Sequence, residues 1–396
     1  MTLKNSLLEQ VLEPFEKKPR AQERLRRRLG VREVERPTYE RYITGPIERF
    51  HSQKNAFAAM KPDNPFGQEF REKYLNRTGL DQYFQPLPES DLEPQDRLGQ
   101  ALTKAAMRLC MEYHPQPLPL TPPEGRIEVE DKAHMSRLIK KVALWCGAEI
   151  VRITRIDPRW VYVDKEINHP YAIVVAVSHD REQLDTAPSF LSGCSTAQAY
   201  SRLKYITTQL TDFIRFLGYD AAYRETLGPD PDMLMVPLAI DAGIGEFSRN
   251  ARCLSPEFGT NIRLKAVTTD LPLEVDRPIS FGVHEFCLAC ENCAKYCPSN
   301  AVPFGEPTEA PDSMFNNPGF KKWYIRADRC LIFWAANPKK WITCGGRCIA
   351  VCPWNKPLNY FHNMVRWMAI RGPRSLIKGL VWSDRVFYQR RKKITK

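Results

Sequence analysis

The sequence predicts a central sheet flanked by helices, in an α/β or α+β arrangement, with a cysteine-rich region after it. Two observations carry this prediction. Segments with apolar residues at helical spacing alternate with short apolar runs typical of strands, and eight of the 12 cysteines lie between Cys287 and Cys352. With 396 residues the chain can form two or three domains, each large enough to bury a core.

Helices and strands alternate over the middle of the chain. Residues 131–146 carry apolar side chains mostly at steps of three and four, and Gly147 is suited to end that helix. Residues 148–156 and 171–177 predict two strands, the second buried on both faces.

A second long helix places an aromatic side chain toward the core. Its apolar stripe includes Leu203, Ile206 and Leu210, and Gly218 is suited to end it. Tyr200 lies three residues before Leu203 on this stripe, so we expect it to face inward. A short helical segment over 236–245, a loop over 246–259 and a strand over 263–273 complete the core.

The chain before this core carries fewer signals. Residues 98–113 have apolar side chains at helical spacing, and the proline-rich stretch 115–123 predicts an extended linker. We expect four parts: a mainly helical amino-terminal region with its linker (1–120), the core (121–278), a cysteine-rich domain (279–360) and a basic helical tail (361–396).

The composition is that of a globular protein with an excess of basic residues. Lys and Arg number 58 against 46 Asp and Glu, a net charge of +12, which suits nucleic acid, an anionic membrane surface or an acidic protein as partner. Residues 385–396 hold six basic residues and no acid, so we expect a solvated tail or a peripheral membrane contact there. No apolar run approaches the roughly 20 residues of a membrane-spanning helix. The first residues lack the pattern of an export signal, and we expect a cytoplasmic protein.

The grouped cysteines have the spacing of iron–sulfur ligands. The first group has the run Cys-x2-Cys-x2-Cys-x3-Cys-Pro of bacterial ferredoxins, whose fourth cysteine binds the other cluster. The second group supplies four more thiolates, enough for two 4Fe-4S clusters, whereas a tetrahedral zinc site fits this run poorly. We therefore expect Cys287, Cys290, Cys293 and Cys352 to hold one cluster, and Cys297, Cys330, Cys344 and Cys348 the other. Two such clusters form an electron path, and the long chain before them is expected to hold the chemistry.

Several segments in combination resemble the corrinoid-dependent reductive dehalogenases. They are Gly243-Ile-Gly-Glu-Phe-Ser-Arg-Asn250, Leu254-Ser-Pro-Glu-Phe-Gly259, the strand 263–273 and Phe281-Gly-Val-His-Glu-Phe-Cys287. Asp157-Pro-Arg-Trp-Val-Tyr162 resembles the start of that family's corrinoid-binding core, and the match covers residues 130–365.

The resemblance implies an α+β, nitroreductase-like core that binds a cobamide, with a ferredoxin-like insertion for the two 4Fe-4S clusters. The lower base of the cobamide is expected to be detached, because the sequence has no Asp-x-His-x-x-Gly run. The family's proton-donating tyrosine corresponds to Tyr200 and its basic partner to Arg263, while the alternatives are a buried tyrosine with a satisfied hydroxyl and an arginine paired with an acid. An organohalide substrate and an external low-potential donor of the ferredoxin or flavodoxin type are also implied. The cofactor contacts that the resemblance suggests are Thr226, Arg249, Ser255, Phe258, Gly259, Leu331 and Thr343.

Two other functions stay open from the sequence. Cys348-Ile-Ala-Val-Cys-Pro-Trp-Asn-Lys356 also resembles the second cluster motif of epoxyqueuosine reductase, a tRNA-modifying enzyme. Against it, Tyr200 stands where that family has an aspartate and the chain ends soon after Cys352, so no nucleic-acid partner is expected. The other alternative is a non-catalytic electron carrier or corrinoid-handling protein. A carrier would show cluster absorbance without a corrinoid band.

Overall fold

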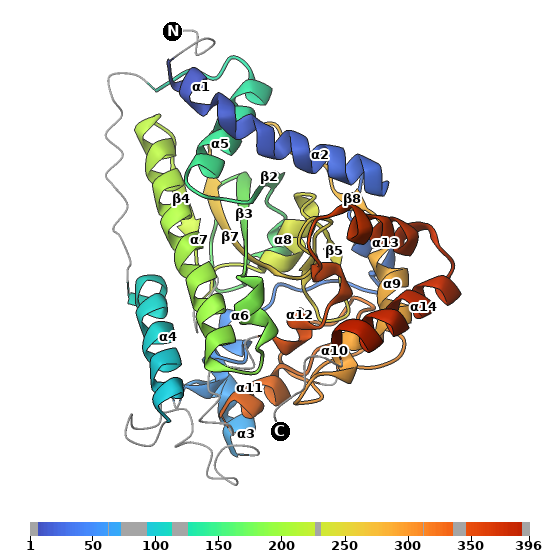
Figure 1. Cartoon of the computed structure of the whole chain (residues 1–396). Coiled ribbons are helices and arrows are strands. Elements are labelled where there is room, and N and C mark those ends of the chain that lie inside the picture. Colours follow the sequence, from blue (N-terminus) through green and yellow to red (C-terminus); the bar gives the residue numbers. More distant parts are fainter. Residues whose placement is uncertain are drawn as a thin grey trace.

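The computed structural model describes residues 7–61, 63–72, 93–112, 126–225, 231–311, 313–335 and 346–389. Its centre is a four-stranded antiparallel sheet in the order β2-β3-β7-β4 (Figure 1). These strands are β2 (Ile150–Arg155), β3 (Tyr171–Ser178), β7 (Ile262–Thr269) and β4 (Ala221–Arg224). Antiparallel pairing throughout this sheet makes the fold α+β.

The remaining elements surround this sheet. Two small antiparallel pairs join β1 (Arg32–Glu33) to β8 (Ile279–Ser280) and β5 (Glu246–Phe247) to β6 (Cys253–Leu254). The helices up to the cysteine-rich region are α1 (Leu7–Leu12), α2 (Lys17–Leu29), α3 (Gln68–Phe70), α4 (Pro94–Glu112), α5 (Lys132–Trp145), α6 (Arg181–Asp185), α7 (Phe190–Phe216) and α8 (Met235–Asp241). Those that follow are α9 (Val283–Cys290), α10 (Asn292–Lys295), α11 (Ala327–Ala335), α12 (Arg347–Ala350), α13 (Tyr360–Arg371), α14 (Arg374–Asp384) and a π-helical turn, Arg385–Gln389.

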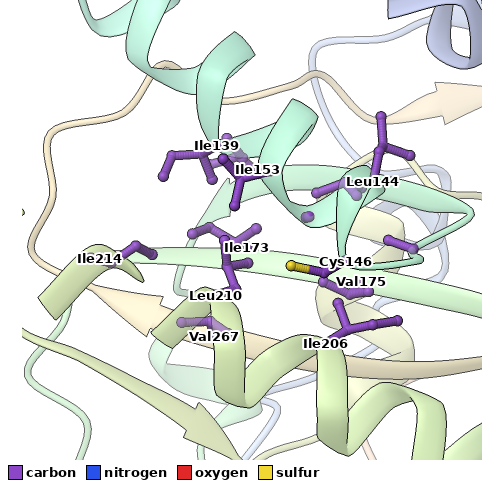
Figure 2. Packing of buried hydrophobic residues seen from close by; sticks show 14 of the residues in the cluster. Ile139, Leu144, Cys146, Ile153, Ile173, Val175, Ile206, Leu210, Ile214 and Val267 are labelled. Carbon is purple, nitrogen blue, oxygen red and sulfur yellow. The ribbon is translucent and has the colours of Figure 1, made fainter. Parts of the chain in front are cut away.

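The sheet is buried on both faces because its strands alternate between two apolar clusters. On one face, Ile153, Ile173 and Val267 pack against α5 and α7 (Figure 2). On the other, Val174 and its neighbours Ala172 and Ala176 pack with α8 and with Trp160. The expectation that 171–177 is a strand buried on both faces is thereby confirmed.

The expected helices and strands of the core are present with small shifts at their ends. α5 ends before Gly147, which has a φ of +109°, and α7 ends before Gly218, with a φ of +84°, a left-handed conformation that suits glycine. Ser189 caps α7 by accepting a hydrogen bond from the backbone N–H of Ser192 at 3.1 Å. The expected loop 246–259 contains the β5–β6 pair, and the proline-rich stretch 115–123 lies outside the described residues.

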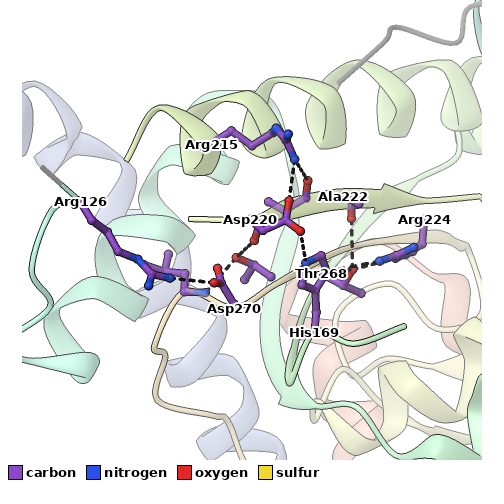
Figure 3. Close-up of polar contacts among 11 residues, drawn as sticks. Arg126, His169, Arg215, Asp220, Ala222, Arg224, Thr268 and Asp270 are labelled. Carbon is purple, nitrogen blue, oxygen red and sulfur yellow. Dashed lines mark hydrogen bonds and ion pairs between the residues drawn. The ribbon is translucent and has the colours of Figure 1, made fainter. Parts of the chain in front are cut away.

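A polar network fixes β4 against α7 and β7 (Figure 3). Arg215 of α7 donates to Asp220 Oδ1 at 2.7 Å, and the ring of His169 lies between Asp220 Oδ2 at 3.0 Å and Thr268 Oγ1 at 2.9 Å. Arg224 donates to the same Thr268 hydroxyl at 2.7 Å. Since these groups are half-buried or buried, the network fixes the position of β4 at the edge of the sheet.

The amino-terminal segment joins the core to the cysteine-rich region. Arg26 of α2 is buried and donates to Glu257 Oε1 at 2.5 Å and to the carbonyl of Gly243 at 2.9 Å. Arg371 of α13 donates to the carbonyl of Leu29 at 2.8 Å. Within the described part of the chain, each helix is too short or too polar to cross a membrane.

Candidate active site and cluster sites

A cavity of about 520 Å³ lies beside the face of the sheet that α8 covers. Most of its wall is aromatic or aliphatic, which excludes water and suits a large, flat, mostly apolar ligand. The wall comes from the amino-terminal segment, the region after β2, α7, α8, β7 and the loop before α11. Its aromatic residues are Tyr39, Phe50, Phe57, Trp160, Tyr162, Tyr200, Phe247, Phe315, Phe320 and Trp323.

The structure brings the two expected catalytic residues together at this wall. Tyr200 lies on α7 and Arg263 is the second residue of β7, and both line the cavity. The guanidinium carbon of Arg263 is 5.2 Å from the centre of the Tyr200 ring. Tyr200 is half-buried and packs against the core cluster, so the expectation that its helix stripe turns it inward is confirmed.

Arg263 is a buried cation without an acidic partner among the described contacts. Its side chain donates to Thr196 Oγ1 at a long 3.4 Å, and its Nε is buried without a hydrogen-bond partner. Burial lowers the pKa of Arg263 to about 10, and Tyr200 acts in the opposite direction. The alternative that Arg263 is a strand-end arginine paired with an acid therefore finds no support in these contacts.

His179 is a second buried residue near Arg263, close enough to be affected by its charge. It follows β3, is 3% exposed, and neither ring nitrogen has a hydrogen-bond partner. Burial, and then the charges of Arg263 and Arg252, hold the pKa of His179 well below its usual range. The imidazole is therefore neutral, and it adds no further positive charge to the wall that carries Arg263.

A buried carboxyl group, that of Asp241, is hydrogen-bonded to two aromatic residues of the cavity wall. Asp241, at the end of α8, accepts hydrogen bonds from the hydroxyl of Tyr39 at 2.5 Å and from the indole N–H of Trp160 at 2.8 Å. Burial raises the pKa of Asp241 to about 7. Because Tyr39 and Trp160 both line the cavity, this carboxyl fixes two of its aromatic walls.

Four of the eight grouped cysteines surround one small, buried hollow. Cys287, Cys290, Cys293 and Cys352 line it, which is the expected first ligand set. Burial raises the pKa of all four thiols, and that of Cys287 to about 12. Four thiols that converge on one buried hollow form the donor set of an iron–sulfur cluster. No three His, Cys, Asp or Glu side chains of the described residues meet closely enough to hold a single ion, whereas the thiolates of a cubane each bind a different iron.

The second ligand set is only partly within the described residues. Cys297, Cys330 and Cys348 are half-buried, and Cys344 lies outside the described part of the chain. Cys348 is the second residue of the short α12 and packs against the apolar cluster that contains Leu184 of α6 and Ala187. It is also close enough to Arg263 and to Cys293 to interact with both electrostatically. Cys348 therefore lies near both the first hollow and the basic residue of the cavity.

One stretch of chain separates the cavity from the first cysteine hollow. Phe247, Ala251 and Arg252 line the cavity, while the intervening residues 248–250 line the hollow. Arg249 is 1% exposed and donates to the carbonyls of Cys287 at 3.0 Å, Pro303 at 2.9 Å and Gly305 at 2.9 Å. Its backbone N–H also points to the sulfur of Cys287 at 3.5 Å. Arg249 thus holds the cluster loop, and its guanidinium is committed to that role.

Three of the other expected cofactor contacts, Ser255, Phe258 and Gly259, follow this stretch along the chain and are not among the residues that line the cavity. The hydroxyl of Ser255 accepts from the backbone of Phe258 at 2.9 Å, and Ser255 also pairs with Gly259. A Cβ at Gly259 would lie 2.2 Å from Asn355 Oδ1, because this turn packs against the chain just after Cys352. Leu331 is buried on α11. Thr226 and Thr343 lie outside the described residues.

The sequence analysis missed most of the cavity wall. Tyr39, Trp160, Phe320 and Lys322 line it, and burial lowers the pKa of Lys322 to about 8. These residues come from segments more than 100 positions apart, so no periodicity within one segment could have joined them. The segment 157–162, which resembles the start of the family's corrinoid-binding core, did point to this wall through Trp160 and Tyr162.

Known proteins are similar to this chain in both sequence and fold. A family model described as a 4Fe-4S dicluster domain matches residues 286–356. The tetrachloroethene reductive dehalogenase of Sulfurospirillum multivorans is 32% identical over 280 residues, which cover 61% of this chain and 54% of that protein. An epoxyqueuosine reductase of Shewanella oneidensis is 32% identical over 102 residues, 26% of this chain and 25% of that protein.

Two solved structures share the fold. A catabolic reductive dehalogenase aligns over 90% of this chain and 48% of its own, with a TM-score of 0.69 and 24% identity. A reductive dehalogenase whose structure suggests a mechanism for B12-dependent dehalogenation aligns over 93% of this chain and 51% of its own, with a TM-score of 0.67 and 22% identity. The chain spans about half the length of the curated relatives it matches. Over the region that it shares with them, the chain is similar in sequence to reductive dehalogenases and shares the fold of two of them, with a shorter stretch of similarity to epoxyqueuosine reductase.

Proposed function

We propose that the chain is a cobamide-dependent reductive dehalogenase that receives electrons through two 4Fe-4S clusters. The overall reaction replaces the halogen of an organohalide by hydrogen, consumes two electrons and one proton, and releases halide. The proposal rests on one observation: Tyr200 and Arg263 meet at the wall of an apolar cavity. Only residues 247–252 separate this cavity from the hollow of four cysteines.

The cavity has the features that a corrinoid needs. Its aromatic and aliphatic lining suits the faces of a flat macrocycle. The unpartnered Nε of Arg263 is a buried donor that a ligand could satisfy. None of the described lining residues is a histidine, so this wall offers no imidazole to take the place of the lower base. When bound, the cobamide supplies the electrons that break the carbon–halogen bond.

The chain itself supplies the proton and the environment. The hydroxyl of Tyr200 transfers its proton to the product carbon. Tyr200 is assigned this role because it lines the cavity and its ring lies beside the cation of Arg263. That cation stabilises the phenolate left behind, since a nearby positive charge favours the ionised form. Because most of the wall is apolar, the charge on Arg263 is screened less than it would be in bulk water.

The substrate is proposed as a small organohalide. Relatives named for tetrachloroethene and a solved relative in complex with 3-bromo-4-hydroxybenzoic acid cover chlorinated alkenes and brominated aromatics. A panel of aryl, vinyl and alkyl halides, with reduced viologen as the electron source, would find the substrate of this chain.

Replacing Tyr200 by Phe tests the proposal at its centre. The ring and its packing stay while the transferable proton is lost, so halide release should fall by about two to four decades. Cobamide and iron contents should not change. The matched control is Tyr205→Phe, because Tyr205 lies on the same helix and is 53% exposed. An unchanged rate in the Tyr200 variant would place the proton donor elsewhere.

Two measurements on the purified holoenzyme test the rest of the proposal. Electron paramagnetic resonance of the cob(II) state should show no nitrogen splitting, whereas a nitrogen triplet would contradict a detached base. RNA that co-purifies with the chain, together with no halide release from any member of the panel, would favour the tRNA-modifying alternative.

A further inference from the structure

A second large hollow lies on the outer side of the cysteine-rich region. It is a groove of about 570 Å³ between α13, α14 and the turn 385–389. These helices form the outer layer of that region (Figure 1). Its wall is mainly apolar, and several of the side chains are exposed: Phe361 by 57%, Met364 by 42% and Phe387 by 59%. Contiguous exposed apolar surface of this kind marks an interaction site.

The groove shares its floor with the first cysteine hollow. Phe286 and Pro353 line both, and each is the direct neighbour of a cysteine of that hollow. Arg385 donates to the carbonyl of Cys290 at 2.6 Å, so the far end of the groove also rests on the cysteine loop. The opposite side of the hollow is formed by residues 248–250, with the cavity behind them. The groove, the hollow and the cavity thus follow one another from the surface inward.

The helices and turn that form the groove carry more basic than acidic residues, and one of the basic residues, Arg374, is paired with Glu285 of α9 at 2.9 Å. Residues 356–389 contain six Lys and Arg and one acid, Asp384. That acid is already paired, because Lys356 Nζ lies 2.8 Å from its Oδ1. Lys378 is exposed on α14, and the sequence beyond 389 adds five more basic residues and no acid. A partner for this surface would therefore carry negative charge around an apolar contact.

We propose that this groove docks an acidic, low-potential electron-carrier protein of the ferredoxin class, which passes electrons to the cluster of the first cysteine hollow. The inference rests on the proposed function and names its electron donor site. In each encounter the reduced cluster of the carrier loses one electron and the oxidised cluster under Phe286 gains it, and no bond forms or breaks. An apolar centre with a charged rim gives the small, rapidly exchanging interface that electron-transfer partners use.

The test measures reduction of the clusters directly. The holoenzyme, without organohalide, is mixed in a stopped-flow instrument with a reduced, strongly acidic two-cluster ferredoxin, and the bleaching of the iron–sulfur absorbance is followed. Lys378→Glu should lower the second-order rate constant about tenfold at low salt, and added salt should shrink the difference. Phe361→Ser combined with Phe387→Ser should lower it similarly at any salt.

The control matches the charge change on a distant helix. Arg137 is exposed on α5, across the sheet from the groove, so Arg137→Glu should leave the rate constant unchanged. Equal rates for all variants and the unmodified chain would overturn the proposal. So would co-sedimentation with phosphatidylglycerol vesicles, or a dimer in solution, if either is abolished by the two Ser changes, because a membrane or a second copy would then occupy the groove.

Viologen-driven halide release separates this proposal from the function on which it rests. Viologens are small and reach clusters without docking, so all groove variants should release halide with viologen at the unmodified rate. The two proposals can also fail separately. If neither the variants nor the unmodified protein release halide, but reduction of the clusters by ferredoxin still depends on the groove, the docking site is supported and the dehalogenase function is contradicted.

Discussion

The sheet region and the cysteine-rich region are built in different ways. β3 runs for eight residues, of which the first seven are buried, and α7 for 27 residues over the same apolar cluster. In the cysteine-rich region, α9, α10, α11 and α12 have eight, four, nine and four residues. Helices that short are marginal without tertiary support.

The difference shows where each region gets its stability. The sheet region buries continuous apolar surface on both faces, which stabilises it without any cofactor. The cysteine-rich region has an apolar cluster of its own, which includes Phe281, Trp323 and Trp354, but Arg249 ties its loops through backbone carbonyls and four of its thiols surround a small hollow. We therefore expect the first region to fold from its own side chains and the second to depend on its clusters.

Removing one cluster should break this contrast most strongly. Reconstituted protein should hold about eight irons and eight sulfides, and Cys290→Ser should lose about half of each. Limited proteolysis should then cut between 283 and 335, while the segment 131–225 stays protected. Cobamide binding should be largely retained. The control is Cys253→Ser, because Cys253 is not among the residues that line the cysteine hollow. This variant should keep the full iron content. A single zinc without sulfide would contradict the cluster assignment.

Arg249 tests the link between the two regions. Its guanidinium reaches the carbonyls of Cys287, Pro303 and Gly305, and a lysine can replace only part of that fork. Each carbonyl left unpaired costs about 1–3 kcal/mol, so Arg249→Lys should lower iron retention and speed release of iron to a chelator. Arg137→Lys is the exposed control. Normal iron retention in the Arg249 variant would show that the clusters alone hold the loop.

Local patterns in the sequence were enough to predict the sheet region. The spacing of apolar residues located α5, β2, β3 and α7, and Tyr200 lies on the inward stripe because an α-helix has a fixed period. The order β2-β3-β7-β4 could not be predicted, because it depends on pairings such as Val177 with Arg263 across more than 80 positions. The family resemblance predicted that Tyr200 and Arg263 act together. Their contact depends on the pairing of β3 with β7, which fixes the position of Arg263.

The cavity wall was beyond prediction for the same reason. Tyr39, Trp160 and Asp241 meet through hydrogen bonds between three distant segments. Only Trp160 lies in a segment that the family resemblance singled out, 157–162, and that resemblance gave no partner for its indole N–H. Arg249 illustrates the opposite problem. Its motif was recognised, but the structure commits its guanidinium to the cluster loop, and only the contacts could show that.

A core substitution should affect the sheet region alone. Ile173 is fully buried in the middle of β3, and Ile173→Ala leaves a cavity that costs about 2–5 kcal/mol. The free energy of unfolding should fall by that amount in protein with and without clusters, measured by denaturant titration of circular dichroism. Iron content should not change in the folded variant. A larger loss in the cluster-loaded protein would mean that the two regions unfold as one unit.

The smallest expected effect is a pH dependence that belongs to the sheet region. Burial raises the pKa of Asp241 to about 7, against an ordinary value of 3.8. Below the ordinary value the carboxyl is protonated in both the folded and the unfolded chain, so this group costs no stability there. As the pH rises toward 7 only the unfolded chain loses the proton, and stability falls by at most about 1.4 kcal/mol per pH unit. Asp241→Asn should remove this slope, because an amide can accept from Trp160 and donate to the oxygen of Tyr39. The measurement is the melting temperature from pH 5 to 8 for the unmodified chain and the variant, with the exposed Asp63→Asn as control.

The opposite outcome is a difference in melting temperature between Asp241→Asn and the unmodified chain that stays the same at every pH. Asp241 would then be ionised in the folded protein and would hold Tyr39 and Trp160 as a carboxylate.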